Sequence, residues 1–234
     1  MSNFRKTTRL KPTQYLETSF LTALTMSERL YGVPYVSTPL YIYSLVEFVC
    51  SKPAPRAMKQ RFDGELFNFK IVLHPAVRGL SQLGIDMELV DTNIERLMPK
   101  TAEDTPDGLS DEFTAVRNEA LRLAEEMGEQ YFDIGHMILA AMRETEIFHG
   151  VDKSLIRQYK AEYCKLENLR KHLGECRARI EQIFPLLEEM NQMGDSESFL
   201  PHLDNGESIP YEELSPKVKA YIQLWQKIMQ LLIS

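Results

Sequence analysis

The segment from Ala120 to Met142, ALRLAEEMGEQYFDIGHMILAAM, is the most informative about the fold, because its pattern occurs twice in the chain. The earlier copy runs from Ala23 to Leu30 (ALTMSERL) and then from Tyr35 to Leu45 (YVSTPLYIYSL), with one extra residue before Tyr35. Each copy reads as a helix, a short turn that carries an aromatic residue, and a second helix with its own start signal. This internal repetition predicts two helical repeats that pack on each other.

A further match follows each copy, Leu83–Asp86 (LGID) after the first and His149–Asp152 (HGVD) after the second. The two repeats differ in length, because 49 residues separate Tyr35 from Gly84 whereas 19 separate Tyr131 from Gly150. The excess lies in a Pro-rich stretch of mixed pattern. We therefore assign residues 50–74 to an insertion in the first repeat.

The repeat resembles that of the double-repeat N-terminal domain of the Clp-type AAA+ unfoldases, which reads roughly A-x-x-L-A-x-x-L-G-x-x-Y-V-G-T-E-H-L-L-L-A-L-L and is followed by L-G-V-D. The matching residues are Ala120, Leu123, Ala124, Gly128, Tyr131, His136, Leu139 and Ala140 in the second copy, and Tyr35, Val36, Thr38, Ile42 and Leu45 in the first. The resemblance implies an all-α, pseudo-twofold module that recruits substrates or adaptors and does no chemistry itself. One subclass of these chaperones disassembles the contractile sheath of type VI secretion.

Two positions depart from the family pattern. The Glu of the family's T-E-H receives phosphorylated arginine in some members, and the matching positions here are Pro39 and Gly135. Neither residue can pair with a cation. The resemblance therefore does not carry this recognition over to the chain.

The double-repeat domain is expected to span residues 1–152. Repeat 1 covers about 15–98, a polar linker covers 99–109, and repeat 2 covers about 110–152. Helix starts are marked by Ser37 before Thr38-Pro39, by Pro75, and by Ser110 followed by two acids, since a hydroxyl caps free amides and Pro at the first position loses no hydrogen bond.

A C-terminal extension follows over residues 153–234. Positions that step alternately by four and three form a heptad seam whose only polar member is Glu162: Leu155, Tyr159, Glu162, Leu166, Leu169, Leu173, Cys176, Ile180, Ile183, Leu187 and Met190. A second seam runs from Leu214 to Leu232 and includes Trp225. Pro185 is expected to kink the first helix or to begin a new one. The two helices predict a coiled-coil-like hairpin, with an intermolecular coiled coil and a homo-oligomer as the alternative.

Composition excludes several classes of protein. The 234 residues carry a net charge of −7 and only a short basic run, Arg56–Arg61, so we expect no nucleic-acid partner. The most apolar window, Val33–Val49, is short and interrupted, so we expect no membrane partner. Three cysteines without metal-ligand spacing suit reduced thiols and a cytoplasmic protein.

The sequence offers no catalytic constellation. It contains no G-x-x-x-x-G-K-[ST] phosphate loop, no G-x-S-x-G and no H-E-x-x-H, so we expect neither an enzyme nor a cofactor. Glu146-x-x-His149 and Asp133-x-x-His136 have the spacing of half a di-iron site, but a full E-x-x-H pair is missing, so no metal is predicted. A structural hydrogen bond is the better interpretation of His136.

The predicted function is protein binding. An apolar groove between or beside the repeats would present Tyr35, Val36, Tyr131, Phe132 and the region of Phe67 to a peptide or helix. The aromatic residues of the insertion, Phe67 among them, could equally cover repeat 1 as added core. Expected partners are a substrate, an adaptor, a sheath-like protein or an AAA+ component. The alternative is a free-standing scaffold that docks or oligomerises through its C-terminal helices.

Overall fold

The computed structural model describes residues 10–50, 73–101, 108–193, 212 and 214–233. Over these residues the fold is all-α, with four strands of two residues each as the exceptions. The chain divides into two compact units, Met1–Leu173 (unit 1) and Gly174–Ser234 (unit 2). Phe67 and most of the predicted insertion lie outside the described residues.

The elements of unit 1 follow the predicted order of the two repeats. The first set is β1 (Lys11–Pro12), α1 (Gln14–Tyr31), β2 (Tyr35–Val36), α2 (Thr38–Cys50), α5 (Pro75–Gln82) and α6 (Met87–Leu97). The second set is β3 (Gly108–Leu109), α7 (Asp111–Glu126), β4 (Tyr131–Phe132), α8 (Ile134–Glu144), the short 3-10 helix η2 (Glu146–Phe148) and α9 (Lys153–Tyr163).

The helices begin and end where the residue chemistry requires. Amides of the first turns are capped by Thr13 on α1, Asp86 on α6 and Ser110 on α7. Gly32 follows α1 with φ 75°, a left-handed conformation that glycine adopts without the penalty of a Cβ atom. The predicted start signals at Pro75 and Ser110 are therefore confirmed.

The four strands form two parallel ladders that connect the two sets of helices. In one ladder β1 pairs with β4, and Lys11 faces Tyr131. In the other β2 pairs with β3, and Tyr35 faces Gly108. In each ladder, the strand before the first helix of one set pairs with the strand before the second helix of the other set. This reciprocity is expected of two repeats related by a pseudo-twofold axis, which stays a prediction.

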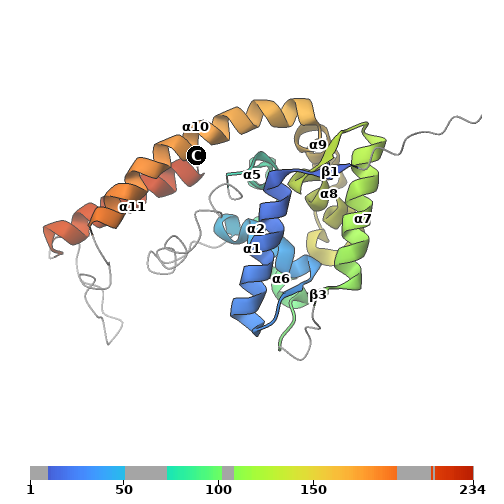
Figure 1. The fold of residues 1–234 in the computed structure, drawn as a ribbon, viewed down its shortest axis with the longest axis horizontal. Helices are drawn as coiled ribbons and strands as arrows, with labels where there is room; N and C mark the ends of the chain where they lie inside the picture. Colours follow the sequence, from blue (N-terminus) through green and yellow to red (C-terminus); the bar gives the residue numbers. More distant parts are fainter. Residues whose placement is uncertain (1–9, 51–72, 102–107, 194–211, 213, 234) are drawn as a thin grey trace, which may run out of the picture. The chain divides into compact units, whose positions relative to one another are not determined.

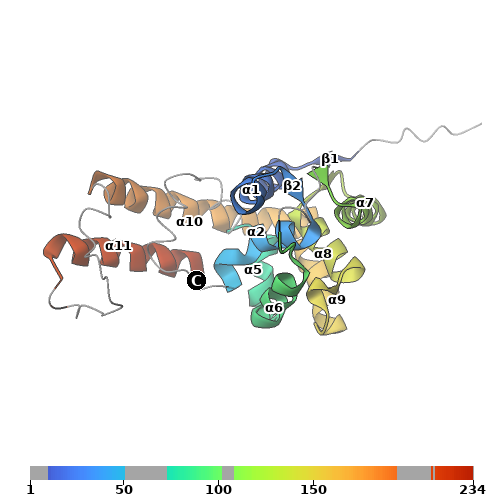
Figure 2. The ribbon, with the colours of Figure 1, turned by 90° about the horizontal axis from the view of Figure 1, so that it is seen from below.

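Unit 1 has three layers of helices. Figure 2 shows α1 and α7 on one side of α2 and α8, with α5, α6 and α9 on the other. The central position of α8 explains why all nine residues from Ile134 to Met142 are buried. The rings of Phe20, Tyr41 and Phe113 lie 5.3–5.6 Å apart between centroids and join α1, α2 and α7 into one core.

The boundary between the units differs from the one expected from sequence. We expected the extension to begin after Asp152, but α9 packs on α5 and α8, and the division falls after Leu173. Tyr159 is fully buried and Tyr163 is nearly so. Their four-residue spacing suits a core face as well as a coiled-coil seam, so the periodicity did not separate the two roles.

Unit 2 contains the C-terminal part of α10 (Leu166–Gln192) and α11 (Pro216–Ile233). In Figures 1 and 2, α11 runs antiparallel beside this part of α10. Pro185 lies inside α10 and does not begin a new helix. The buried face of unit 2 consists of Ile183, Met190, Val218, Tyr221, Leu224, Trp225 and Ile228.

No helix in the described part of the chain is both long enough and apolar enough to cross a bilayer.

Candidate functional site

The residues predicted to line a binding groove lie in the two parallel ladders. Tyr35, Val36 and Phe132 are buried there, with 6%, 1% and 2% of their surface exposed. Tyr131 is 40% exposed and is the one predicted site residue among the described positions whose side chain can meet a partner directly. Val36 and Phe132 belong to the hydrophobic core of unit 1.

The two ladders lie at opposite ends of α1. β1·β4 precedes this helix and β2·β3 follows it. Because α1 has 18 residues, its ends are about 27 Å apart at 1.5 Å per residue. The structure therefore does not bring Tyr35 and Tyr131 together, and a single peptide touching both turns would have to run the full length of α1.

Other exposed apolar side chains mark a surface that the sequence analysis did not single out. Leu21 and Leu30 on α1 are 63% and 54% exposed, and Leu109 on β3 is 47% exposed. Leu30 and Leu109 share one end of unit 1, because β3 pairs with the strand that follows α1. Helical periodicity could have found Leu21, which falls off the buried face of α1, but Leu109 lies in a two-residue strand without a pattern.

A buried polar cluster of Thr13, His74 and Asp133 lies next to the β1·β4 ladder. The hydroxyl of Thr13 donates to one oxygen of Asp133, the residue that follows β4. His74 places Nε2 3.2 Å from the other oxygen, although this contact lacks hydrogen-bond geometry. Asp133 thereby connects three segments: the start of α1, the start of α5 and the start of α8.

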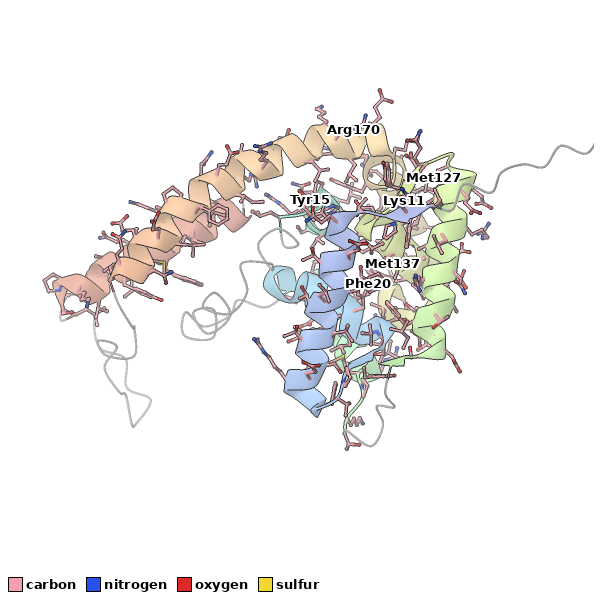
Figure 3. All side chains as sticks on the ribbon, viewed as in Figure 1. Lys11, Tyr15, Phe20, Met127, Met137 and Arg170 are labelled. Atoms are coloured by element: carbon pink, nitrogen blue, oxygen red, sulfur yellow. The ribbon has the colours of Figure 1, made fainter. Side chains whose placement is uncertain are left out.

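The ring nitrogens of His74 have separate tasks. Its Nδ1 accepts a hydrogen bond from the Ala76 amide at 3.3 Å and caps α5, so Nε2 is left to carry the proton that faces Asp133. The ring also packs against Tyr15, with centroids 5.1 Å apart. Figure 3 shows Tyr15 at the start of α1. Because Nδ1 caps α5 and the residue has no exposed surface, His74 is not placed to act as a general base on a substrate.

The pKa of Asp133 lies below its ordinary value. Burial alone would raise the pKa, but the nearby imidazole of His74 and the hydroxyl of Thr13 outweigh this effect. The carboxylate is therefore charged at neutral pH although only 3% of its surface is exposed.

His136 has the structural role that the sequence analysis preferred. Its Nδ1 accepts a hydrogen bond from the Asp133 amide at 3.1 Å, which satisfies a donor at the start of α8. Burial lowers the pKa of His136 to about 4, against weaker opposing effects of Asp133 and the Cys164 backbone. At neutral pH the imidazole is therefore uncharged.

The end of α9 covers the start of α8. The Cys164 thiol donates to the Gly135 carbonyl at 3.3 Å, and burial raises the pKa of this thiol well above its usual range. A Cβ atom at Gly135 would lie 2.4 Å from the Tyr163 carbonyl oxygen. This close approach explains why residue 135 is a glycine.

These features favour a structural role for the cluster. The thiol is buried and protonated, which makes it a poor nucleophile. Within the described residues, no three side chains of His, Cys, Asp or Glu are grouped to hold a metal ion. The spacing Asp133-x-x-His136 could have indicated the capping interaction, whereas the partnership with His74 had no local signal.

A scan against models of known protein families gives no match for this chain, and no curated protein matches it significantly.

Proposed function

We propose that the chain is a non-enzymatic protein-binding module, similar to the domain that recruits substrates or adaptors to Clp-type unfoldases. The observation that supports this proposal is the reciprocal pairing of the ladders, in which β1 pairs with β4 and β2 with β3. In this pairing each helix-turn-helix segment contributes one strand to each ladder. The polar groups inside the frame cap helices and join segments, so the outer surface is where a partner would bind.

The proposed contact surface is the end of unit 1 that carries Leu30 and Leu109. Both side chains are large, apolar and about half exposed. An apolar peptide or one face of an amphipathic helix would cover them at little entropic cost to this unit, since α1 and the ladder already hold their backbone in place. Tyr131 marks a second candidate contact at the opposite end.

The test uses the full-length chain, tagged and purified from its native cells, with co-purifying proteins identified by mass spectrometry. We expect Leu30→Asp and Leu109→Asp to lose the dominant partner, because each places a charge in the apolar contact. Asn118→Asp is the matched control, since it adds a charge at an exposed position of α7. Circular dichroism should show that the three variants keep the parental helix content. An AAA+ protein as the partner would support a role in recruitment.

The second candidate function is a scaffold that docks through its C-terminal helices in the cytoplasm. Phe184 on α10 favours it, because this aromatic ring is 45% exposed. In the same assay Phe184→Asp would then lose the partner while Leu109→Asp kept it. Retention of the partner by all the variants would contradict both functions.

A further inference from the structure

The C-terminal part of α10 exposes an apolar stripe beside the buried face of unit 2. The buried face takes Ile183 and Met190 from this helix. Phe184 follows Ile183 directly and therefore lies about 100° around the helix from it. The ring of Phe184 is 45% exposed, and Ile180 and Leu187, four residues before it and three after it, are partly exposed on the same side. A single exposed phenylalanine is ordinary, but a ring in line with two aliphatic side chains favours a contact surface.

The charges along this stripe are divided between its two ends. Arg177 precedes Phe184 by seven residues and Glu188 follows it by four, so both lie along the same edge of the stripe. Both side chains are exposed. Arg177 is 83% exposed although its Nε donates to Glu181 Oε1 at 3.0 Å. This bond uses one of the five N–H groups of the guanidinium, so Arg177 can bind a further carboxylate.

A second copy of α10 that runs in the opposite direction would complement these charges. Arg177 and Glu188 of one chain cannot pair with each other, because the 11 positions between them correspond to about 17 Å along the helix. In an antiparallel pair with a twofold axis near Phe184, Arg177 of each copy faces Glu188 of the other. A parallel pair would instead place Arg177 opposite Arg177 and Glu188 opposite Glu188, and like charges repel.

The apolar side chains fit the same antiparallel register. Ile180 of one copy lies opposite Leu187 of the other, on the edge of the stripe away from Arg177, and the two Phe184 rings meet at the centre. These pairings and the ionic one agree in register to within one helical turn. A contact between identical surfaces has to be complementary to itself, and a basic end and an acidic end on either side of an apolar centre meet this requirement.

We propose that the chain forms a twofold homodimer in which the C-terminal parts of two α10 helices pack antiparallel through Phe184. The contact uses the face next to Ile183 and Met190, so these residues stay in the buried face of unit 2. The inference goes beyond partner recruitment and does not rest on it, since Leu30 and Leu109 belong to unit 1. It names a second copy of the chain as the protein that would bind the exposed ring of α10.

The experiment measures the mass of the purified full-length chain by analytical ultracentrifugation over a range of concentrations. The purified chain has no other protein to bind, so the result is independent of recruitment through Leu30 and Leu109. One helix from each copy makes a smaller contact than a standard protein–protein interface, and we expect a dissociation constant on the order of 10 µM. A mass that stays at that of one chain up to about 200 µM would overturn the proposal.

Truncation of the central ring is the first variant. Phe184→Ala should raise the dissociation constant of the dimer at least about tenfold, because the ring is exposed in one chain and covered in the pair. Gln182→Ala is the matched control, since residue 182 is exposed on the opposite side of α10, and it should keep the parental constant. Circular dichroism should show parental helix content in both variants. Equal dissociation constants for Phe184→Ala and the parent would overturn the proposal.

Charge reversal tests the antiparallel register. Arg177→Glu and Glu188→Arg should each weaken the dimer about tenfold, because each places like charges opposite each other at two symmetric positions. A mixture of the two variants should form a heterodimer of about parental affinity, and so should the chain that carries both changes. Glu189→Arg is the matched control, since residue 189 is exposed on another side of α10, and its dimer should be as stable as that of the parent. Single variants that dimerise like the parent, or a double variant as weak as the single ones, would contradict the antiparallel pairing.

Discussion

His136 should make the stability of unit 1 depend on pH in the range between neutrality and pH 4. Its pKa is lowered from 6.5 to about 4 in the folded state, chiefly because the imidazole is buried. The unfolded chain therefore binds a proton in a range where the folded chain does not. The contribution of His136 to the free energy of unfolding is therefore fully present above about pH 6.5, and it is lost progressively as the pH falls toward 4.

The magnitude follows from the two pKa values. With 6.5 for the unfolded state and about 4 for the folded state, linkage predicts a loss of about 2 kcal/mol between pH 7 and pH 5. The full shift corresponds to about 3 kcal/mol. Either value is a large share of the 5–15 kcal/mol by which domains are usually stable.

The assay is urea unfolding at a series of pH values from 4.5 to 7.5, followed by circular dichroism. His136→Asn is the informative variant, because its Oδ1 can accept the hydrogen bond from Asp133 in place of Nδ1 but does not titrate. We expect this variant to be less stable at pH 7, since a smaller side chain leaves a cavity, and to lose about 2 kcal/mol less than the parent on going to pH 5.

The single tryptophan provides an internal control. Trp225 lies in unit 2, so its fluorescence reports on the other compact unit under identical conditions. Its transition should be unaffected by His136→Asn. A parent and a variant with the same dependence on pH would refute the assignment of a buried, neutral imidazole.

Three further predictions concern single contacts within unit 1. Asp133→Asn should destabilise the chain by about 1–3 kcal/mol at pH 7, because it removes the charge that Thr13 and His74 face. In urea titrations the difference in stability from the parent should shrink as the pH falls from 3.8 through the lowered pKa of Asp133, where the parent's carboxylate becomes protonated. A difference that stays constant over this pH range would show that the carboxylate is unimportant. Tyr41→Phe should cost about 1 kcal/mol through loss of the 2.8 Å hydrogen bond to Ser19, and thermal unfolding at an unchanged temperature would contradict that contact. Asn93→Ala should cost about 1–3 kcal/mol of stability, because the Asn93 side chain donates to two carbonyls of the η2 region. Arg96→Ala should cost less than about 1 kcal/mol, because the Arg96–Glu146 pair is exposed. Equal losses of stability in urea titrations would contradict this ranking.

The sequence predicted the helices well where local chemistry marks their ends. Ser110 and Pro75 identify helix starts for local reasons. A hydroxyl can accept a hydrogen bond from a free amide of the first turn, and proline has no amide hydrogen that would need a partner there. The repeated pattern also predicts that α1 and α2 correspond to α7 and α8, and this correspondence stays a prediction. These signals need only neighbours in the chain, so a single sequence contains them.

The ladders and the polar cluster could not be predicted in the same way. A two-residue strand such as β3 is too short to show alternation, and its partner lies far away in the sequence. Thr13 and Asp133 are 120 positions apart, and nothing near either residue specifies the other. For the same reason the sequence did not show that Tyr35 and Tyr131 lie at opposite ends of α1: both turns were recognised, but their reciprocal pairing was not.

The reciprocal ladders also constrain how the protein can be made. The strand that precedes α1 leaves the ribosome first, yet its partner at Tyr131 is synthesised 120 residues after Lys11. At about 5–20 residues per second this interval lasts roughly 6–24 s. During that time β1 has no β4 with which to pair, and the apolar faces of the first set of helices lack the second set that covers them in the folded unit. The β1·β4 ladder can therefore form only after residues 131–132 have been synthesised.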